Sequence, residues 1–161
     1  MSDPTAVVPG LGEPRRAEVQ KLYNSPELAI LNVIWGPLMT IIPTQSLDVG
    51  SDRRLRRARG QYLWGRVLEK AGARVEAAGA KSLGERDAEP LSRVIIHSVT
   101  NPLPRLRGAV HVYGGDFFSV SRSEWDPETL LERNYDMEKN MRPFEAANLA
   151  YTKFVAQRGI Q

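Results

Sequence analysis

The longest uncharged stretch, 20 consecutive residues from Leu28 to Leu47, constrains the fold of this chain more than any other feature. A membrane-spanning helix needs about 20 mainly apolar residues. Arginines come after this stretch, and arginines also flank membrane spans on the cytoplasmic or matrix side. Asn32, Gly36, Pro37 and Pro43 interrupt it, however, and such interruptions favour a segment buried in protein. We therefore expect burial in the core or against a partner, with membrane insertion as the alternative. The side chains expected to be buried in one of these ways are Leu28, Ile30, Leu31, Val33, Ile34, Trp35, Leu38, Met39, Ile41 and Ile42.

A strongly basic segment follows between Arg53 and Arg74. It carries a charge of +7, whereas the whole chain carries only +3. Apolar residues recur in it at helical spacing, and Ser51 or Asp52 can cap a helix, so we expect a long basic amphipathic helix over residues 51–83. Arginine suits contacts with carboxylates and phosphates because its planar group binds them with two hydrogen bonds. The residues expected to contact a partner protein or lipid head groups are Arg53, Arg54, Arg56, Arg57, Arg59 and Arg66.

Prolines and glycines divide the rest of the chain into short elements. Residues 1–26 contain four prolines and are expected to form an extended arm, with one short helical turn over residues 15–23. Residues 93–99 are rich in β-branched side chains and predict a strand. Two further predicted strands, 109–113 and 117–122, flank Gly114 and Gly115, which favour a tight hairpin turn. These segments predict a small antiparallel sheet over residues 93–122.

Two helices are expected at the C-terminal end. Asp126 can cap a helix with Pro127 as its first residue, and Pro143 can start a second helix that ends near Arg158. The predicted fold is therefore of the α+β class, with an extended proline-rich arm over residues 1–26 and one small domain over residues 27–161. That domain comprises the apolar segment (27–47), the basic helix (51–83), the small sheet (93–122) and the helices (127–158).

The sequence contains no recognisable catalytic, cofactor-binding or metal-binding motif. His97 and His111 have no metal-ligand spacing, and an isolated histidine in a strand is most often structural. The acidic residues between positions 124 and 138 fit the first turn and solvated face of a helix. His111 and Asp116 could form a hydrolase triad with a serine, but a triad is defined by geometry and the sequence has no nucleophile elbow. The candidate serines are Ser98, Ser119 and Ser121.

These features favour a non-catalytic accessory subunit of a larger multi-subunit assembly. The chain has no cysteine, which fits a reducing intracellular compartment, and its first residues predict neither a secretory signal nor a mitochondrial presequence. The expected partners are other protein subunits and anionic lipid, at the mitochondrial inner membrane or otherwise in the cytoplasm. Three alternatives remain: a soluble virion or scaffold protein, a protein that binds nucleic acid through the basic helix, and a small hydrolase that uses His111.

Overall fold

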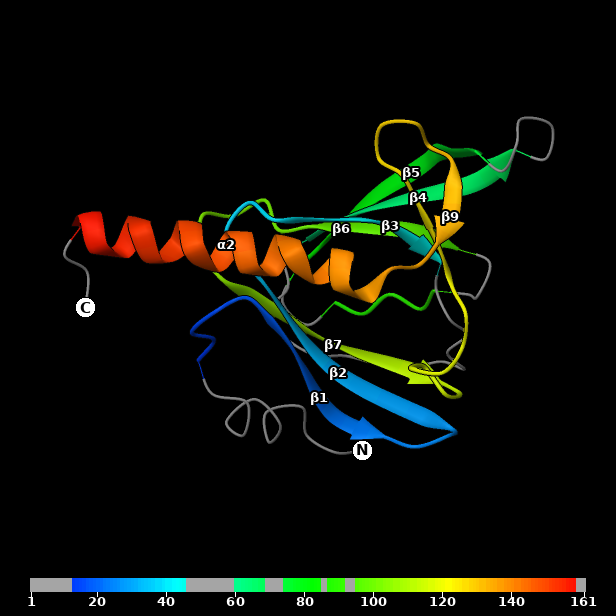
Figure 1. Cartoon of the computed structure of the whole chain (residues 1–161), viewed down its shortest axis with the longest axis horizontal. Coiled ribbons are helices and arrows are strands. Elements are labelled where there is room, and N and C mark those ends of the chain that lie inside the picture. Colours follow the sequence, from blue (N-terminus) through cyan, green and yellow to red (C-terminus); the bar gives the residue numbers. More distant parts are fainter. Residues whose placement is uncertain (1–12, 46–59, 69–73, 85–86, 92–94, 159–161) are drawn as a thin grey trace.

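The computed structural model describes residues 13–45, 60–68, 74–84, 87–91 and 95–158. In this part of the chain, nine strands form two antiparallel sheets, and one helix accompanies them (Figure 1). The three-stranded sheet has the order β1 (Glu18–Asn24), β2 (Leu28–Trp35), β7 (Arg107–Gly114). The six-stranded sheet has the order β5 (Arg74–Leu83), β4 (Gly60–Leu68), β6 (Ile96–Thr100), β3 (Thr40–Gln45), β8 (Ser123–Trp125), β9 (Glu132–Asn134).

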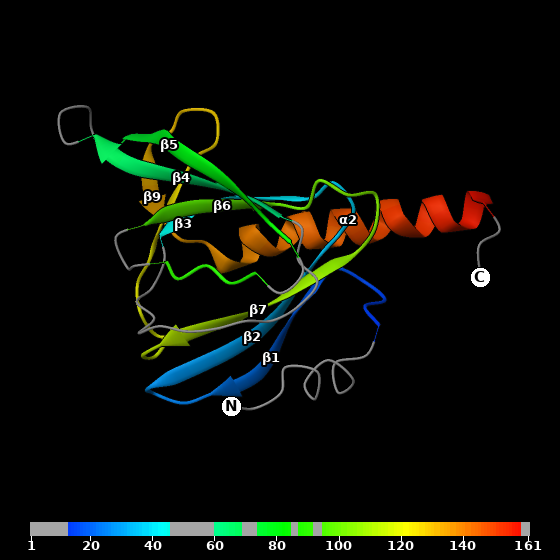
Figure 2. The same ribbon diagram turned by 180° about the vertical axis from the view of Figure 1, so that it is seen from behind.

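The two sheets form two layers, and helix α2 (Met137–Arg158) lies along one open side between them. Seen from behind, the same arrangement appears with the helix on the far side (Figure 2). The N-terminal half of α2 runs beside the sheets, whereas its C-terminal half extends beyond both of them (Figures 1 and 2). The main core lies between the layers and includes Leu31, Trp35, Val99 and Phe144.

The uncharged stretch forms two strands and the turn between them. Its run of apolar residues is continuous because β2 is buried on both faces, a pattern typical of a central strand. Gly36 and Pro37 lie in the turn, where Leu38 adopts a φ of 56° and is exposed. The other predicted positions are buried (Leu31, Val33, Ile34, Trp35, Met39) or half-buried (Leu28, Ile30, Ile41, Ile42) within the chain's own fold. In the part that the structure describes, no helix is long and apolar enough to span a membrane.

The predicted long basic helix is wrong. Its described residues form the antiparallel strands β4 and β5, and β4 also pairs with β6. Three glycines, Gly60, Gly65 and Gly79, lie in these strands, and each costs about 1 kcal/mol in a helix. Arg66 lies in β4. The remaining predicted contact residues, Arg53, Arg54, Arg56, Arg57 and Arg59, lie outside the described residues.

The arm and the small sheet also differ from the prediction. Residues 18–24 form β1 instead of a helical turn, and residues 1–12 lie outside the described part. Strands β6 and β7 confirm the strands predicted at 93–99 and 109–113. The Gly-Gly hairpin is wrong, because β7 pairs with β2 and residues 117–122 form no strand. Gly115, with a φ of 74°, instead donates its N–H to the carbonyl of Glu27 at 2.7 Å, which holds the end of β7 beside the β1–β2 turn.

A single C-terminal helix replaces the two that were predicted. Asp126 accepts hydrogen bonds from the N–H groups of Glu128 and Thr129, both at 3.0 Å, but this cap closes a turn that leads into β9. Asp136 caps α2 by accepting from the N–H of Lys139 at 3.0 Å. Pro143 lies inside α2 and does not begin a second helix. The predicted α+β arrangement is therefore replaced by two antiparallel sheets with one helix in the described residues.

Candidate functional site

A cavity of about 310 Å³ lies between the two sheets and the N-terminal half of α2. Alternate residues of the strands line it, as expected where one face of each strand points inward. Strand β2 contributes Leu31, Val33 and Trp35, and the opposite sheet contributes residues such as Val99. Its volume is at the lower end of the range typical of sites for small organic molecules. The two sheets and the helix thus enclose a mainly apolar space.

An aromatic row runs along one wall of this cavity. Its members are joined ring to ring, with centroid distances of 5.5 Å (Trp35–His111), 5.9 Å (His111–Tyr113), 4.0 Å (Tyr113–Phe117) and 5.2 Å (Phe117–Phe118). Three of these distances lie in the range of favourable aromatic pairs, and Tyr113 and Phe117 are closer still. The row therefore forms a continuous aromatic surface on one side of the cavity.

Two polar atoms in the aromatic row are buried without a hydrogen-bond partner among the described residues. They are Nε1 of Trp35 and Nε2 of His111. The other ring nitrogen of His111, Nδ1, lies 3.2 Å from the hydroxyl of Tyr113. An unsatisfied buried polar group costs about 1–3 kcal/mol, and most such groups in native proteins are paired. Both atoms belong to residues that line the cavity, although the atoms themselves are covered by their neighbours in this structure.

The two histidines are neutral near pH 7. Burial lowers the pKa of His97 to about 4. Burial and, secondarily, the charge on His97 lower the pKa of His111 to about 4. Both residues line the cavity. Its interior therefore takes no positive charge from its histidines at neutral pH.

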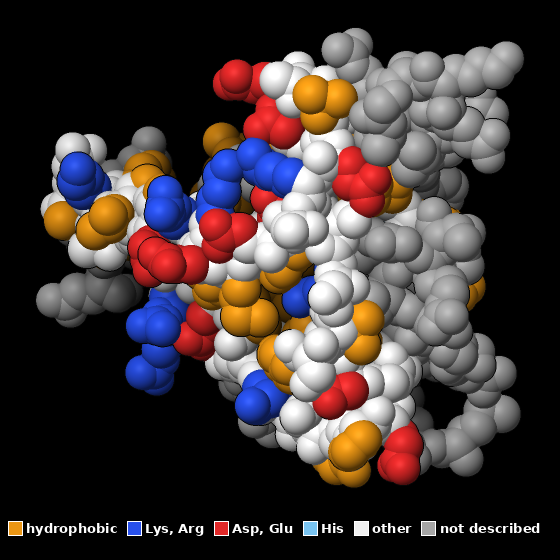
Figure 3. Space-filling model, turned by 45° about the vertical axis from the view of Figure 1, so that its right-hand side comes forward, with side chains coloured by type: hydrophobic (Ala, Val, Ile, Leu, Met, Phe, Trp, Pro, Cys, Tyr) orange, Lys and Arg blue, Asp and Glu red, His pale blue; other side chains and the backbone are white. Residues whose placement is uncertain are grey.

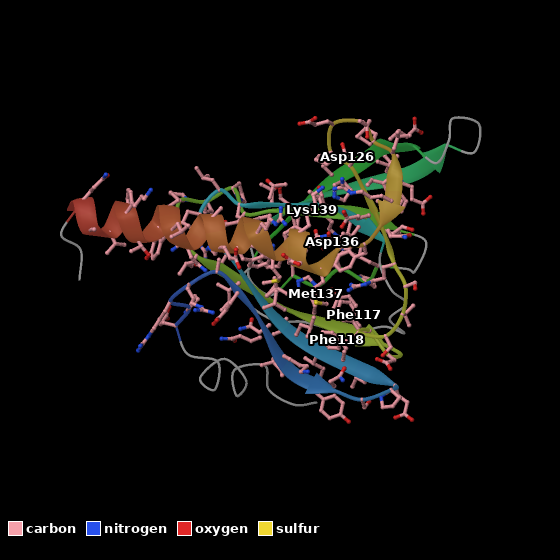
Figure 4. The ribbon with its side chains drawn as sticks, viewed as in Figure 1. Phe117, Phe118, Asp126, Asp136, Met137 and Lys139 are labelled. Atoms are coloured by element: carbon pink, nitrogen blue, oxygen red, sulfur yellow. The ribbon has the colours of Figure 1, made fainter. Side chains whose placement is uncertain are left out.

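The cavity opens beside the N-terminal end of α2. Val19, Phe118 and Met137 line it and are exposed, whereas Trp35 and Phe144 are each only 3% exposed and lie at its interior. Figure 4 shows Phe117 and Phe118 below the start of the helix, on the same side as Met137. On the face shown in Figure 3, hydrophobic side chains gather around a hollow near α2, with Lys or Arg side chains among them.

A satisfied buried carboxylate fixes the start of α2 beside the cavity. Glu124, which is 0% exposed, accepts hydrogen bonds from Nε of Arg133 at 2.6 Å, from the N–H of Asp136 at 3.2 Å and from Nδ2 of Asn140. Arg133 also donates from Nη1 to Asp126 at 2.8 Å. This set of residues, the Glu124 network, ties β8 and β9 to the first two turns of the helix.

A second set of contacts holds α2 farther along its length. The Asn148 side chain accepts from the N–H of Ala17 at 2.7 Å and donates to its carbonyl at 2.9 Å. Gly36 lies so close to the helix that a Cβ built on it would be 2.4 Å from Cβ of Ala147. The helix is therefore anchored on both sides of the cavity.

The structure does not assemble the hydrolase triad. His111 contacts Trp35 and Tyr113, and among the described residues neither Asp116 nor a serine bonds to it. Within the same part of the chain, no group of three or more His, Cys, Asp or Glu residues could hold a metal ion. Sequence reasoning missed most of the cavity residues, including Tyr113, Phe117 and Arg122. The alternation of Ala109, His111 and Tyr113 was the available signal, since it predicts one inward face.

Comparison with protein-family models and with curated proteins found no match to this chain.

Proposed function

We propose that this protein binds a small, largely apolar organic molecule in the cavity between its sheets. The observation that supports this proposal is an apolar cavity of about 310 Å³ lined by two residues whose buried ring nitrogens have no hydrogen-bond partner among the described residues. Apolar walls with a few inward-facing polar groups are typical of sites for small organic ligands. The aromatic row offers flat surfaces for the body of such a ligand.

The two unpartnered atoms indicate which polar group the ligand carries. Nε1 of Trp35 can only donate a hydrogen bond, so it requires an acceptor such as a carbonyl, ether or hydroxyl oxygen. Nε2 of His111 donates or accepts according to the tautomer, and the Tyr113 hydroxyl beside Nδ1 is compatible with both tautomers. A hydroxyl group on the ligand would suit both atoms, because it donates and accepts. The proposed ligand therefore carries at least one oxygen within an otherwise apolar body.

Titration with N-phenyl-1-naphthylamine, an uncharged fluorescent probe, tests this proposal. We expect saturable binding with a fluorescence increase, because the probe passes from water into an apolar site. Replacing Val99→Phe adds a ring to a residue that lines the cavity and should abolish binding. Val110→Phe is the matched control. Val110 is adjacent to His111 in β7, and because His111 lines the cavity, the side chain of Val110 points to the opposite face of the strand.

Two results would contradict the proposal. One is the absence of saturable binding to the native chain. The other is equal binding by the Val99→Phe and Val110→Phe variants, which would place the probe outside the cavity. Circular dichroism of each variant confirms that it is folded before its binding is compared.

A partner-binding role is a second candidate. The half of α2 that extends beyond the sheets carries the exposed apolar residues Leu149 and Phe154 (Figure 1). This observation supports the predicted accessory subunit, because apolar side chains on a projecting helix suit burial against another protein. Native purification followed by mass spectrometry tests it. Migration as a free monomer would contradict this role and leave the ligand proposal intact.

A further inference from the structure

Two cationic side chains line the cavity near its opening. Lys21 comes from β1, and Arg122 comes from the segment between β7 and β8. No Asp or Glu is among the described residues that line the cavity. Within the same part of the chain, neither cation lies within ion-pair distance of a carboxylate. Among the described residues, the cavity wall thus carries two positive charges that form no ion pair with a carboxylate.

Aromatic rings hold both cations in place. The guanidinium of Arg122 lies 4.1 Å from the ring centroid of Phe117 and 4.0 Å from that of Tyr135. Nζ of Lys21 lies 5.1 Å from the centroid of Phe118. Cation–π contacts of this kind favour the charged group without neutralising it. The N–H groups of the guanidinium are the means by which Arg122 can bind a ligand.

The electrostatics of the cavity therefore select the charge of its ligand. A cation entering the site would meet two like charges and no carboxylate. An uncharged molecule would gain apolar burial but nothing from the cations. An organic anion gains both, and a carboxylate also matches the two parallel donors of an arginine.

We infer that the ligand is a small organic carboxylate, whose apolar body lies along the aromatic row and whose charged end is bound by Lys21 and Arg122. This inference rests on the proposed function, since it requires that the cavity binds an organic molecule. It adds the orientation of that molecule: the carboxylate lies at the opening, and the body, with the oxygen proposed above, extends inward toward Trp35. Phe118 stacks against one cation and Phe117 against the other, so the rings that begin the row also position the charges.

Isothermal titration with decanoate and with 1-decanol tests the inference, because the two probes share a ten-carbon chain and differ in charge. We expect the native chain to bind decanoate at least about tenfold more tightly, as charge-assisted hydrogen bonds allow. Lys21→Gln together with Arg122→Gln should remove this preference, so that the variant binds decanoate no more tightly than 1-decanol. Lys21→Gln alone should remove part of it, and Lys21 is exposed, so this variant keeps the fold. Lys139→Gln is the control, since Lys139 is a cation on α2 that does not line the cavity (Figure 4).

The outcomes separate this inference from the proposed function. Equal affinities for decanoate and 1-decanol in the native chain would overturn the carboxylate assignment but support an apolar binding site. Loss of the decanoate preference in Lys139→Gln would also overturn it, because the effect would then come from overall charge. If neither probe binds and N-phenyl-1-naphthylamine does not bind either, the proposed function itself fails.

Discussion

The Glu124 network and the aromatic row both bury polar groups beside α2, but only the Glu124 network provides hydrogen-bond partners for all of them among the described residues. Glu124 is fully buried and receives hydrogen bonds from Arg133, Asp136 and Asn140. Trp35 and His111 each present a buried nitrogen with no partner among the described residues. The fold provides three hydrogen-bond donors for the Glu124 carboxylate, so it could also have provided a partner for each ring nitrogen.

This difference in hydrogen bonding distinguishes buried polar groups that stabilise the fold from buried polar groups that are available to a ligand. Burying a carboxylate is costly, and the cost is offset only when donors surround it, as they do at Glu124. The two ring nitrogens belong to residues that line the cavity, which is where a ligand would bind. Removing a group from the first set should therefore destabilise the protein, whereas removing one from the second set should not.

The largest effect expected of a single group is the loss of Glu124. Glu124→Ala leaves Arg133 half-paired and removes an acceptor from two donors, so we expect the free energy of unfolding to fall by about 3 kcal/mol. Urea denaturation followed by circular dichroism measures this change. Glu138→Gln is the control: Glu138 is paired only with Arg142 at 3.9 Å, both side chains are largely exposed, and such pairs contribute little. Equal losses of unfolding free energy in the two variants would contradict the stabilising role that distinguishes the Glu124 network from the aromatic row.

The second expected effect is a loss of stability in mild acid. The pKa values of His97 and His111 are lowered from 6.5 to about 4, so the unfolded chain binds protons before the folded chain does. Stability is therefore complete above about pH 6.5 and is lost as the pH falls toward about 4. At pH 5 each histidine should cost about 2 kcal/mol relative to pH 7.

His111→Phe tests the part of this pH dependence that belongs to the cavity. The phenyl ring keeps the stacking surface but takes up no proton, so the difference in unfolding free energy between pH 7 and pH 5 should shrink by about half. Tyr113→Phe is the control, because it removes the hydroxyl beside Nδ1 and leaves the titrating ring in place. An unchanged pH dependence in His111→Phe would show that His111 titrates normally in the folded protein.

The close contact between Gly36 and α2 gives the third prediction. Gly36→Ala would place Cβ 2.4 Å from Cβ of Ala147, so the helix must shift and we expect a loss of about 2 kcal/mol. Because the shift displaces the helix that borders the cavity, binding of N-phenyl-1-naphthylamine should weaken as well. Adding Ala147→Gly should restore the binding and part of the stability, since glycine in a helix costs about 1 kcal/mol. A variant with unchanged stability would mean that the helix does not rely on this contact.

Part of this fold follows from the sequence. The strands near residues 93–99 and 109–113 were predictable because β-branched residues and alternation mark them. Burial of the uncharged stretch was predictable from its composition, but its conformation was not. A short apolar run buried on both faces does not show whether it is a helix or a strand.

Other elements depend on partners that are distant in sequence. Residues 60–83 contain apolar positions at helical spacing, yet β4 pairs with both β5 and β6, and the glycines in β4 and β5 were the local sign against a helix. Asp126 was predicted to cap a helix, but it closes a local turn that leads into β9. The cavity joins β1, β2, β3, β6, β7 and α2, so its composition could not be read from one segment. Whether the chain also acts as an accessory subunit stays a prediction.

The smallest expected effect is also the most direct comparison of buried groups, because the same substitution can be made at two buried tryptophans. Trp125 is 2% exposed and packs with Val75 and Ile96, so Trp125→Phe should cost about 1–2 kcal/mol through lost packing. Trp35→Phe loses similar packing but also removes an unsatisfied donor, whose burial costs about 1–3 kcal/mol, so the two terms should nearly cancel. Urea denaturation of both ligand-free variants measures the difference. If Trp35→Phe lowers the free energy of unfolding as much as Trp125→Phe does, burial of Nε1 of Trp35 costs nothing. That result would contradict the proposal that this atom donates a hydrogen bond to an oxygen of the ligand.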